Sequence, residues 1–493
     1  MNTRSKESNR ASGQDVEAAE AADMKITRLE SPSAISTSHG GILKDSTDIV
    51  VVGEAKYHRL GWKRLTLMLI VEAIALGSLS IPSAFATLGM VAGIICCVFI
   101  GIIAMYASYV IGQVKLAFPS VRHYGDAGTL LMGRFGYELF FTMFLLQLVF
   151  VTGSHCLTGT IAMVQITGTS CPRHFGISLT LVLAGSSICA LIFGVVSAII
   201  LLLLAIPSSF ADITILGYID FASIIAAIGI TIISTGIQAT NAPGGLAAVS
   251  WSALPKENVT FSEAYVAIGN IVFAYSFATC QFSFMDEMHT PQDFTKSIVS
   301  LGLLEIVIYT VTGATLYAFV GSGVQSPALL SAGGLISRVA FGIALPVIFI
   351  SGSINTIVAG RLILTRAFEN SVIRYVNTPR GWFIWLTLIS TLTIAAWIIA
   401  EAIPFFNDLL SIASALFTSG FSFYIPPIMW FVLIRKGRWC SKKNLPLVVI
   451  NALVFVFGVA ILVCGLYSSI QEIVSLQSTA SRSHLAGALA KMG

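Results

Sequence analysis

Long apolar stretches separated by short polar segments cover most of the chain after residue 60. A helix needs about 20 consecutive apolar residues to cross about 30 Å of hydrocarbon. Such stretches occur at residues 65–88, 91–114, 136–163, 183–206, 213–237, 264–285, 298–320, 337–360, 381–400, 408–433 and 445–468. The pattern therefore predicts an all-α polytopic membrane protein with eleven transmembrane helices.

The remaining segments are polar. Residues 1–60 are rich in Ser and predict a disordered cytoplasmic tail, residues 61–470 form the transmembrane domain, and residues 471–493 form a short C-terminal tail. Only 11% of the residues are charged, against about 25% in soluble domains. The eight Cys have neither disulfide-framework nor metal-ligand spacing, so we expect no metal. We also expect no cofactor and no nucleic-acid partner.

The fourth apolar stretch is too long for a simple span. No charged residue occurs from Phe175 to Ile206, which corresponds to about 48 Å of helix at 1.5 Å per residue. Either the helix is strongly tilted, or residues 175–186 form an additional segment at the membrane surface. Two spans in this stretch would reverse the membrane orientation of every segment that follows.

The distribution of Lys and Arg decides the orientation, because cytoplasmic loops are enriched in both. With eleven spans and a cytoplasmic N-terminus, the outer loops carry only Arg173, Lys256 and Arg338, and the other loop cations are inside. The Asn258-Val259-Thr260 sequon also falls in an outer loop, where glycosylation takes place.

Two spans contain residues that weaken a helix. The first contains GSLSIPSAF, in which Pro82 removes a backbone hydrogen bond to Ser78 and Gly77 tolerates unusual dihedrals. The alternative is a simple Pro kink. The sixth has the small, hydroxylated centre Tyr275–Thr279. Breaks in helices one and six are typical of transporters with a 5+5 inverted repeat, here followed by one extra helix, and such breaks suit a zwitterionic substrate.

The same residues resemble a known family. GSLSIPSAFATLG is similar to the first-span signature of the amino acid/auxin permease family, and Met285-Asp286-Glu287-Met288 followed by Pro291 and Phe294 is similar to its sixth-span ending. The resemblance covers roughly residues 58–470 and is strongest to neutral amino acid permeases of filamentous fungi. It implies an amino acid substrate and a proton as the driving ion.

The family's pattern also implies the binding residues. Backbone and hydroxyl groups of the first span would hold the substrate's carboxylate and amine, and the sixth span would line the side-chain pocket. Span eight offers a polar face that could complete the cavity, although small residues there also favour helix packing. The candidate substrate-binding residues are Gly77, Ser78, Leu79, Ser80, Tyr275, Ser276, Phe277, Ser351 and Asn355.

Ionisable residues within spans are costly and are functional candidates by default. Glu72, five residues before Gly77, and His155 are the candidates for proton coupling. We expect Glu305 to form a structural pair and Asp220 to be partly solvated. The pair Asp286-Glu287, unusual on a positively charged side, could close an inner gate with a basic loop.

The sequence therefore predicts a secondary active transporter, a proton-coupled symporter of neutral amino acids. A sodium-coupled permease and an amino-acid sensor with little transport are the alternatives. No catalytic motif indicates an enzyme. We expect the plasma membrane as the location, with the vacuolar membrane as the alternative.

Overall fold

The computed structural model describes residues 61–168, 188–208, 210–368, 371–403 and 405–475. All of these belong to one compact unit, Val52–Gly493. The predicted tail at residues 1–60 and the question about residues 175–186 lie outside the described residues.

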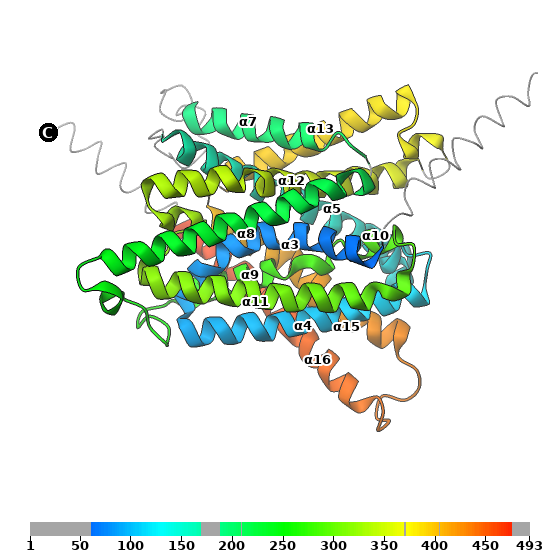
Figure 1. Ribbon diagram of the computed structural model, residues 1–493. Helices are drawn as coiled ribbons and strands as arrows, with labels where there is room; N and C mark the ends of the chain where they lie inside the picture. The colour runs from blue at the N-terminus through cyan, green and yellow to red at the C-terminus, as the bar shows by residue number, and fades with distance from the viewer. Residues whose placement is uncertain (1–60, 169–187, 209, 369–370, 404, 476–493) are drawn as a thin grey trace, which may run out of the picture. The chain divides into compact units, whose positions relative to one another are not determined.

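The described residues form helices and the connections between them (Figure 1). The long helices are α3 (Trp62–Leu88), α4 (Met90–Ala117), α5 (Tyr124–Thr167), α7 (Ile188–Leu204), α8 (Phe210–Asn241), α11 (Phe294–Val320), α12 (Gly334–Ala367), α13 (Pro379–Ala402) and α16 (Leu445–Ala460). The short elements are η1 (Gly245–Ala248), α9 (Phe261–Ala274), η2 (Ser276–Ala278), α10 (Gln281–Asp286), η3 (Pro291–Asp293), η4 (Gly321–Gly323), η5 (Ala328–Ala332) and η6 (Val372–Tyr375).

Span ten consists of consecutive short helical segments rather than one regular helix. These are α14 (Phe406–Ala413), η7 (Ser414–Thr418), η8 (Gly420–Tyr424), α15 (Ile425–Met429) and η9 (Trp430–Ile434), and η10 (Ile461–Gly465) follows α16. The segments η7, η8, η9 and η10 are π-helical. Such wider turns are rare and are frequent at functional sites.

Nine helices of the described residues are long and apolar enough to cross a membrane, and two shorter apolar helices are Ala190–Leu204 and Phe261–Ala274. The described residues contain no strand. The all-α, multi-pass class is therefore confirmed. Eleven complete spans and the inverted repeat stay predictions.

Helix α3 lies at the centre of the helix packing and contacts α8, α9, α11 and α12 (Figure 1). Nearly all of its residues from Leu65 to Leu88 are buried. A helix that is apolar on all sides is expected to be enclosed by other helices. Residues that face outward from α3 therefore meet protein rather than lipid.

The expected break in the first span is wrong for this structure, because α3 is one helix with Pro82 inside it. The hydroxyl groups are satisfied within the helix. Ser78 Oγ donates to the Ile74 carbonyl at 2.7 Å, and Ser80 Oγ donates to the Gly77 carbonyl at 3.0 Å. Since only the bond that Pro82 cannot make is lost, the helix continues without unwinding.

The sixth span is broken, as expected. Thr260 begins α9 as its N-cap by accepting from the Glu263 amide at 3.2 Å, and α9 ends at Ala274. The short turn η2 and residues Thr279 and Cys280 then lead into α10. The break lies against the middle of α3.

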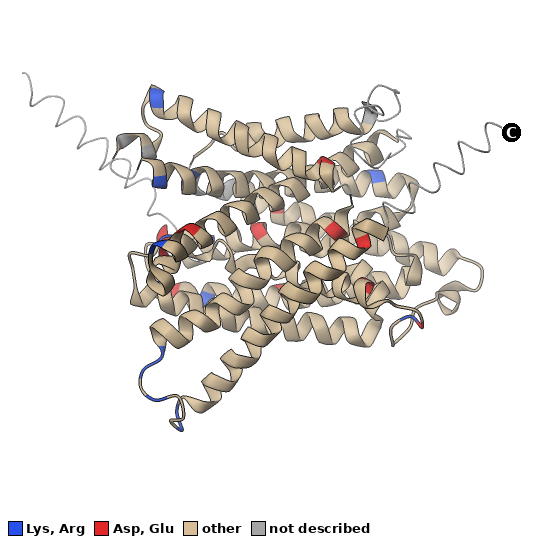
Figure 2. Ribbon diagram, turned by 180° about the vertical axis from the view of Figure 1, so that it is seen from behind, with Lys and Arg blue, Asp and Glu red and all other residues tan. Residues whose placement is uncertain are grey.

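Lys and Arg gather at one end of the helices, and few lie at the opposite end (Figure 2). This arrangement is the one that the charge pattern predicts for a membrane protein. The cytoplasmic location of that end stays a prediction.

Candidate functional site: the α3 and span-six interface

The break in span six approaches α3 at a glycine. A Cβ atom added to Gly77 would lie 2.8 Å from both Cα and Cβ of Ala274 and 3.1 Å from the Tyr309 hydroxyl. No larger side chain fits there without movement. Gly77 thus permits close approach of two backbones, a role different from the unwinding expected from the sequence.

Tyr309 of α11 connects the two elements. Its hydroxyl lies 3.1 Å from the Ala73 carbonyl of α3 and 3.1 Å from the Ala274 carbonyl at the end of α9. Its ring packs edge-on against Tyr275, with 5.1 Å between centroids. The carbonyl at the end of α9, which has no partner further along its own helix, is thereby satisfied.

The predicted binding residues of spans one and six are buried and lie on both sides of this contact. The Ser78 and Ser80 hydroxyls bond to their own helix, and Leu79 is buried. Ser276 and Phe277 lie in η2. The Tyr275 hydroxyl has no hydrogen-bond partner among the described residues.

Span eight reaches the same region from another side. Ser351 Oγ of α12 lies 2.6 Å from the Val71 carbonyl of α3 and 3.1 Å from Asp220 Oδ1 of α8. Asn355 donates to the Ser351 carbonyl at 3.1 Å. The structure thus brings Ser351 next to α3. Asp220 is only 1% exposed, so the expectation that it is partly solvated is wrong, because α12 covers it.

Two buried carboxyl groups lie on α3 and α11, which pack on each other at this interface. Glu72 is 8% exposed and Glu305 of α11 is 0% exposed, and they are close enough to repel each other when both are charged. The Cys280 thiol at the end of the break faces Glu72. Both carboxyl oxygens of Glu305 lack a hydrogen-bond partner among the described residues. The structural pair expected for Glu305 is therefore not formed.

His155 lies elsewhere, at the interface of α5 and α12. Its side chain packs on Gly352, where an added Cβ would lie 2.7 Å from the His155 Cβ. The histidine and Glu72 thus belong to different helix interfaces.

Ion pairs hold the basic end of the helices together. Lys115 of α4 forms a 2.7 Å bond with Asp286 and donates to the Val121 carbonyl at 2.6 Å. Arg361 of α12 pairs with Glu287. The cations come from α4 and α12, and together they tie the end of span six to its neighbours.

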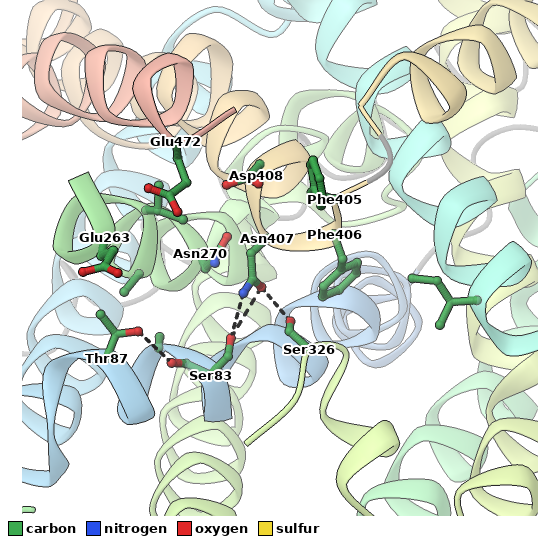
Figure 3. Close-up of a pocket in the computed structure, with 14 residues that line it drawn as sticks. Ser83, Thr87, Glu263, Asn270, Ser326, Phe405, Phe406, Asn407, Asp408 and Glu472 are labelled. Carbon is green, nitrogen blue, oxygen red and sulfur yellow. Dashed lines mark hydrogen bonds between the residues drawn. The ribbon is translucent and has the colours of Figure 1, made fainter. Parts of the chain in front are cut away.

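A cavity of about 330 Å³ opens at the opposite end of α3. Ser83 and Thr87 of α3 line it, together with Asn270 of α9 and Asn407 of α14 (Figure 3). Its acidic residues are Glu263, Asp408 and Glu472. The loop before α9 lies at the same end, because the amides of Met90 and Val91 bond to the carbonyls of Ser252 and Ala253. Asn258, in this loop, is exposed.

Sequence reasoning did not identify Tyr309 or the residues around the cavity. Tyr309 is an ordinary aromatic in an apolar helix, and nothing local marks its contacts. Asn270, Asp408 and Glu472 carried a usable signal, since each is polar within or beside an apolar stretch. Their proximity depends on the packing of three helices that are far apart in the chain.

A multi-pass helical bundle with a broken helix packed on a buried central one is the architecture of a membrane transporter. The family described as transmembrane amino acid transporter protein matches residues 58–471. The chain belongs to this family.

Several relatives match along most of their length. The chain is 58% identical over 435 residues to the N amino acid transport system protein of Neurospora crassa, covering 88% of this chain and 89% of the relative. A protein called transmembrane transporter from Fusarium pseudograminearum is 24% identical, covering 85% of this chain and 84% of the relative. Another of the same name from Gibberella moniliformis is 26% identical, covering 90% of each chain. The chain is a transporter of the transmembrane amino acid transporter family and not an enzyme.

Proposed function

We propose that the protein is a symporter that couples the uptake of neutral amino acids to protons. The observation that carries the proposal is the pair of buried carboxyl groups, Glu72 and Glu305, beside the span-six break. Burial without a cationic partner makes the charged form of a carboxyl costly, and two neighbouring carboxylates make double ionisation costlier still. A site of this kind can gain and lose a proton as the surrounding helices move.

The substrate class follows from the lining of the break. Tyr275 and Phe277 are aromatic, Ser276 is small and polar, and no basic side chain forms an ion pair with Glu72 or Glu305 in the described residues. An acidic substrate would meet like charge, whereas an apolar side chain would meet aromatic surface. A relative named as an amino acid transport system protein supports an amino acid as the substrate.

The two ends of the bundle differ in a way that fits alternating access. Ion pairs close the basic end, and the cavity beside Ser83 and Thr87 opens the other. With the N-terminus in the cytoplasm, the cavity faces outward together with the Asn258 sequon. We propose the plasma membrane as the location, with the vacuolar membrane as the alternative, and glycosylation of Asn258 in the secretory route accords with both.

The energetics of one proton are sufficient. One charge moved through 100 mV supplies about 2.3 kcal/mol, which corresponds to roughly fifty-fold accumulation at 1.4 kcal/mol per factor of ten. One coupled proton per substrate would therefore support useful concentration of a neutral amino acid.

The decisive experiment is uptake of labelled leucine into proteoliposomes with an imposed pH gradient and no sodium. We expect accumulation that collapses when a protonophore removes the gradient. Accumulation that requires sodium would show that sodium, and not the proton, is the coupling ion. Binding without uptake would indicate a sensor.

A Glu72→Gln variant tests the carboxyl group directly. It keeps the shape of the side chain, and we expect exchange across the membrane to persist while gradient-driven accumulation is lost. The matched control is Glu138→Gln, which alters an exposed carboxylate that pairs with Arg366 on the surface. Normal accumulation by Glu72→Gln would remove Glu72 from the proton path.

A further inference from the structure

The cavity at the end of α3 has a charge that neither the fold nor the transport proposal explains. Glu263 comes from α9, Asp408 from α14 and Glu472 from the last helix, and all three line it. No Lys, Arg or His is among the described residues that line the cavity. Three carboxylates around one hollow create a negative potential that attracts cations.

A second observation points to a bound group. The Asn270 side chain is 1% exposed, lines the cavity, and its carbonyl oxygen Oδ1 has no hydrogen-bond partner among the described residues (Figure 3). Leaving a buried acceptor unsatisfied is costly. The neighbouring Asn407 differs, because its Oδ1 lies 2.6 Å from the Ser326 hydroxyl and its amide donates to Ser83 Oγ at 3.2 Å.

Glu263 is held in place by hydrogen bonds, and Asp408 is buried. One oxygen of Glu263 accepts from the Thr260 amide at 2.8 Å and lies 3.1 Å from the Thr260 hydroxyl. Asp408 lies in the first turn of α14 and is largely buried. A site with carboxylates and one unsatisfied buried oxygen suits a ligand that donates hydrogen bonds and carries positive charge.

The volume of the cavity and the arrangement of its side chains favour an organic cation over a metal ion. Among the described residues no three His, Cys, Asp or Glu side chains are arranged to hold a metal ion. The volume of about 330 Å³ is at the lower end of small-molecule pockets. A neutral zwitterion would place its carboxylate among three others without a surplus of positive charge, so a ligand of net positive charge fits better.

We propose that this cavity is a binding site for an organic ammonium cation, distinct from the span-six break beside Gly77 and Tyr309. Asn270 Oδ1 accepts from one ammonium group, and Glu263, Asp408 and Glu472 compensate the charge. The same chemistry occurs in a diamine and in the side chain of a basic amino acid. The site does not require transport, so the proposed symport and this site can fail independently.

The test is direct binding of labelled 1,5-diaminopentane to the purified full-length protein in detergent. We expect saturable binding that weakens as salt is raised, because screening reduces attraction between charges. A double variant, Asp408→Asn with Glu472→Gln, should weaken binding about tenfold or more, as expected for loss of charge-assisted hydrogen bonds. Glu257→Gln, an exposed carboxylate six residues before Glu263, should bind as the wild type does.

Asn270→Leu separates a binding role from a structural one. It removes the unsatisfied oxygen at similar volume, so we expect weaker diamine binding at an unchanged or higher melting temperature. A melting temperature that falls while binding stays intact would show that Asn270 only supports the fold, and would overturn its assignment as a ligand group.

Lysine in place of the diamine distinguishes the two sources of the cation. Tighter binding of lysine than of the diamine would identify a station for basic amino acids, and tighter binding of the diamine would identify an amine site. The absence of binding by both, equal binding by the double variant, or displacement of the diamine by low calcium concentrations would overturn the proposal.

Discussion

Replacing Gly77 by Ala tests whether the close contact between α3 and the span-six break governs function. The new Cβ would lie 2.8 Å from Cα and Cβ of Ala274, whereas carbon atoms normally approach to about 3.5 Å. The two backbones must therefore separate by about 0.7 Å. Overpacking of this kind costs about 1–3 kcal/mol, and the higher helix propensity of Ala returns at most about 1 kcal/mol.

Gly342→Ala is the matched control, because Gly342 is also inside a helix, α12, and an added Cβ there would meet nothing within 4 Å. This variant gains the higher helix propensity of Ala without the steric clash. The difference between the two variants in detergent melting temperature therefore reports the packing cost. We expect Gly77→Ala to melt several degrees lower than Gly342→Ala.

Initial uptake of labelled leucine is the second readout. We expect Gly77→Ala to reduce it about tenfold, corresponding to about 1.4 kcal/mol, because the break can no longer rest against α3. Gly342→Ala should transport normally. Equal melting temperatures and equal uptake in the two variants would refute the view that this contact shapes the site.

Three further outcomes follow from the described contacts. Tyr309→Phe removes the hydroxyl between the Ala73 and Ala274 carbonyls, so the melting temperature should fall by the equivalent of about 1 kcal/mol; an unchanged value would contradict the connecting role. Lys115→Gln leaves Asp286 without its cation and should speed hydrogen exchange of the α10 amides about tenfold; unchanged exchange would show that the ion pair does not hold that end. Burial lowers the pKa of His123, which precedes α5, below its usual 6.5, and the nearby negative charge of Asp126 offsets only part of this lowering. The folded state then binds the proton less readily than the unfolded state, so stability is full above pH 6.5 and declines as the pH falls; His123→Gln should flatten the decline in melting temperature between pH 7.5 and 5, and an identical slope would argue against it.

The all-α, multi-pass class could be predicted because hydrophobic length is a direct physical requirement of the bilayer. The break at Tyr275–Cys280 was also accessible, since small and hydroxylated residues interrupt an apolar stretch there. The GSLSIPSAF stretch shows the limit of this reasoning. Ser hydroxyls and a Pro are compatible both with unwinding and with hydroxyl bonds to the preceding turn, and the surrounding packing decides between them.

The candidate site was predictable for residues on α3 and much less so for their partners. Glu72 stands out as a charge in an apolar stretch, whereas the proximity of Glu305 depends on how α11 packs on α3. Asp220 is buried because Ser351 of a distant helix covers it. Such contacts join residues separated by more than a hundred positions, and no local pattern encodes them.

The continuity of α3 limits which end of a substrate the helix can recognise. A Ser hydroxyl has a single proton to donate, and the hydroxyls of Ser78 and Ser80 already donate theirs to backbone carbonyls. Pro82 leaves the Ser78 carbonyl without its usual partner. In this conformation the stretch from Ser78 to Pro82 therefore offers only acceptors to a ligand, which suit an ammonium group and not a carboxylate. A carboxylate needs donors from another element, or from amides that α3 would release by unwinding, so full recognition of an amino acid requires more than this helix in its present form.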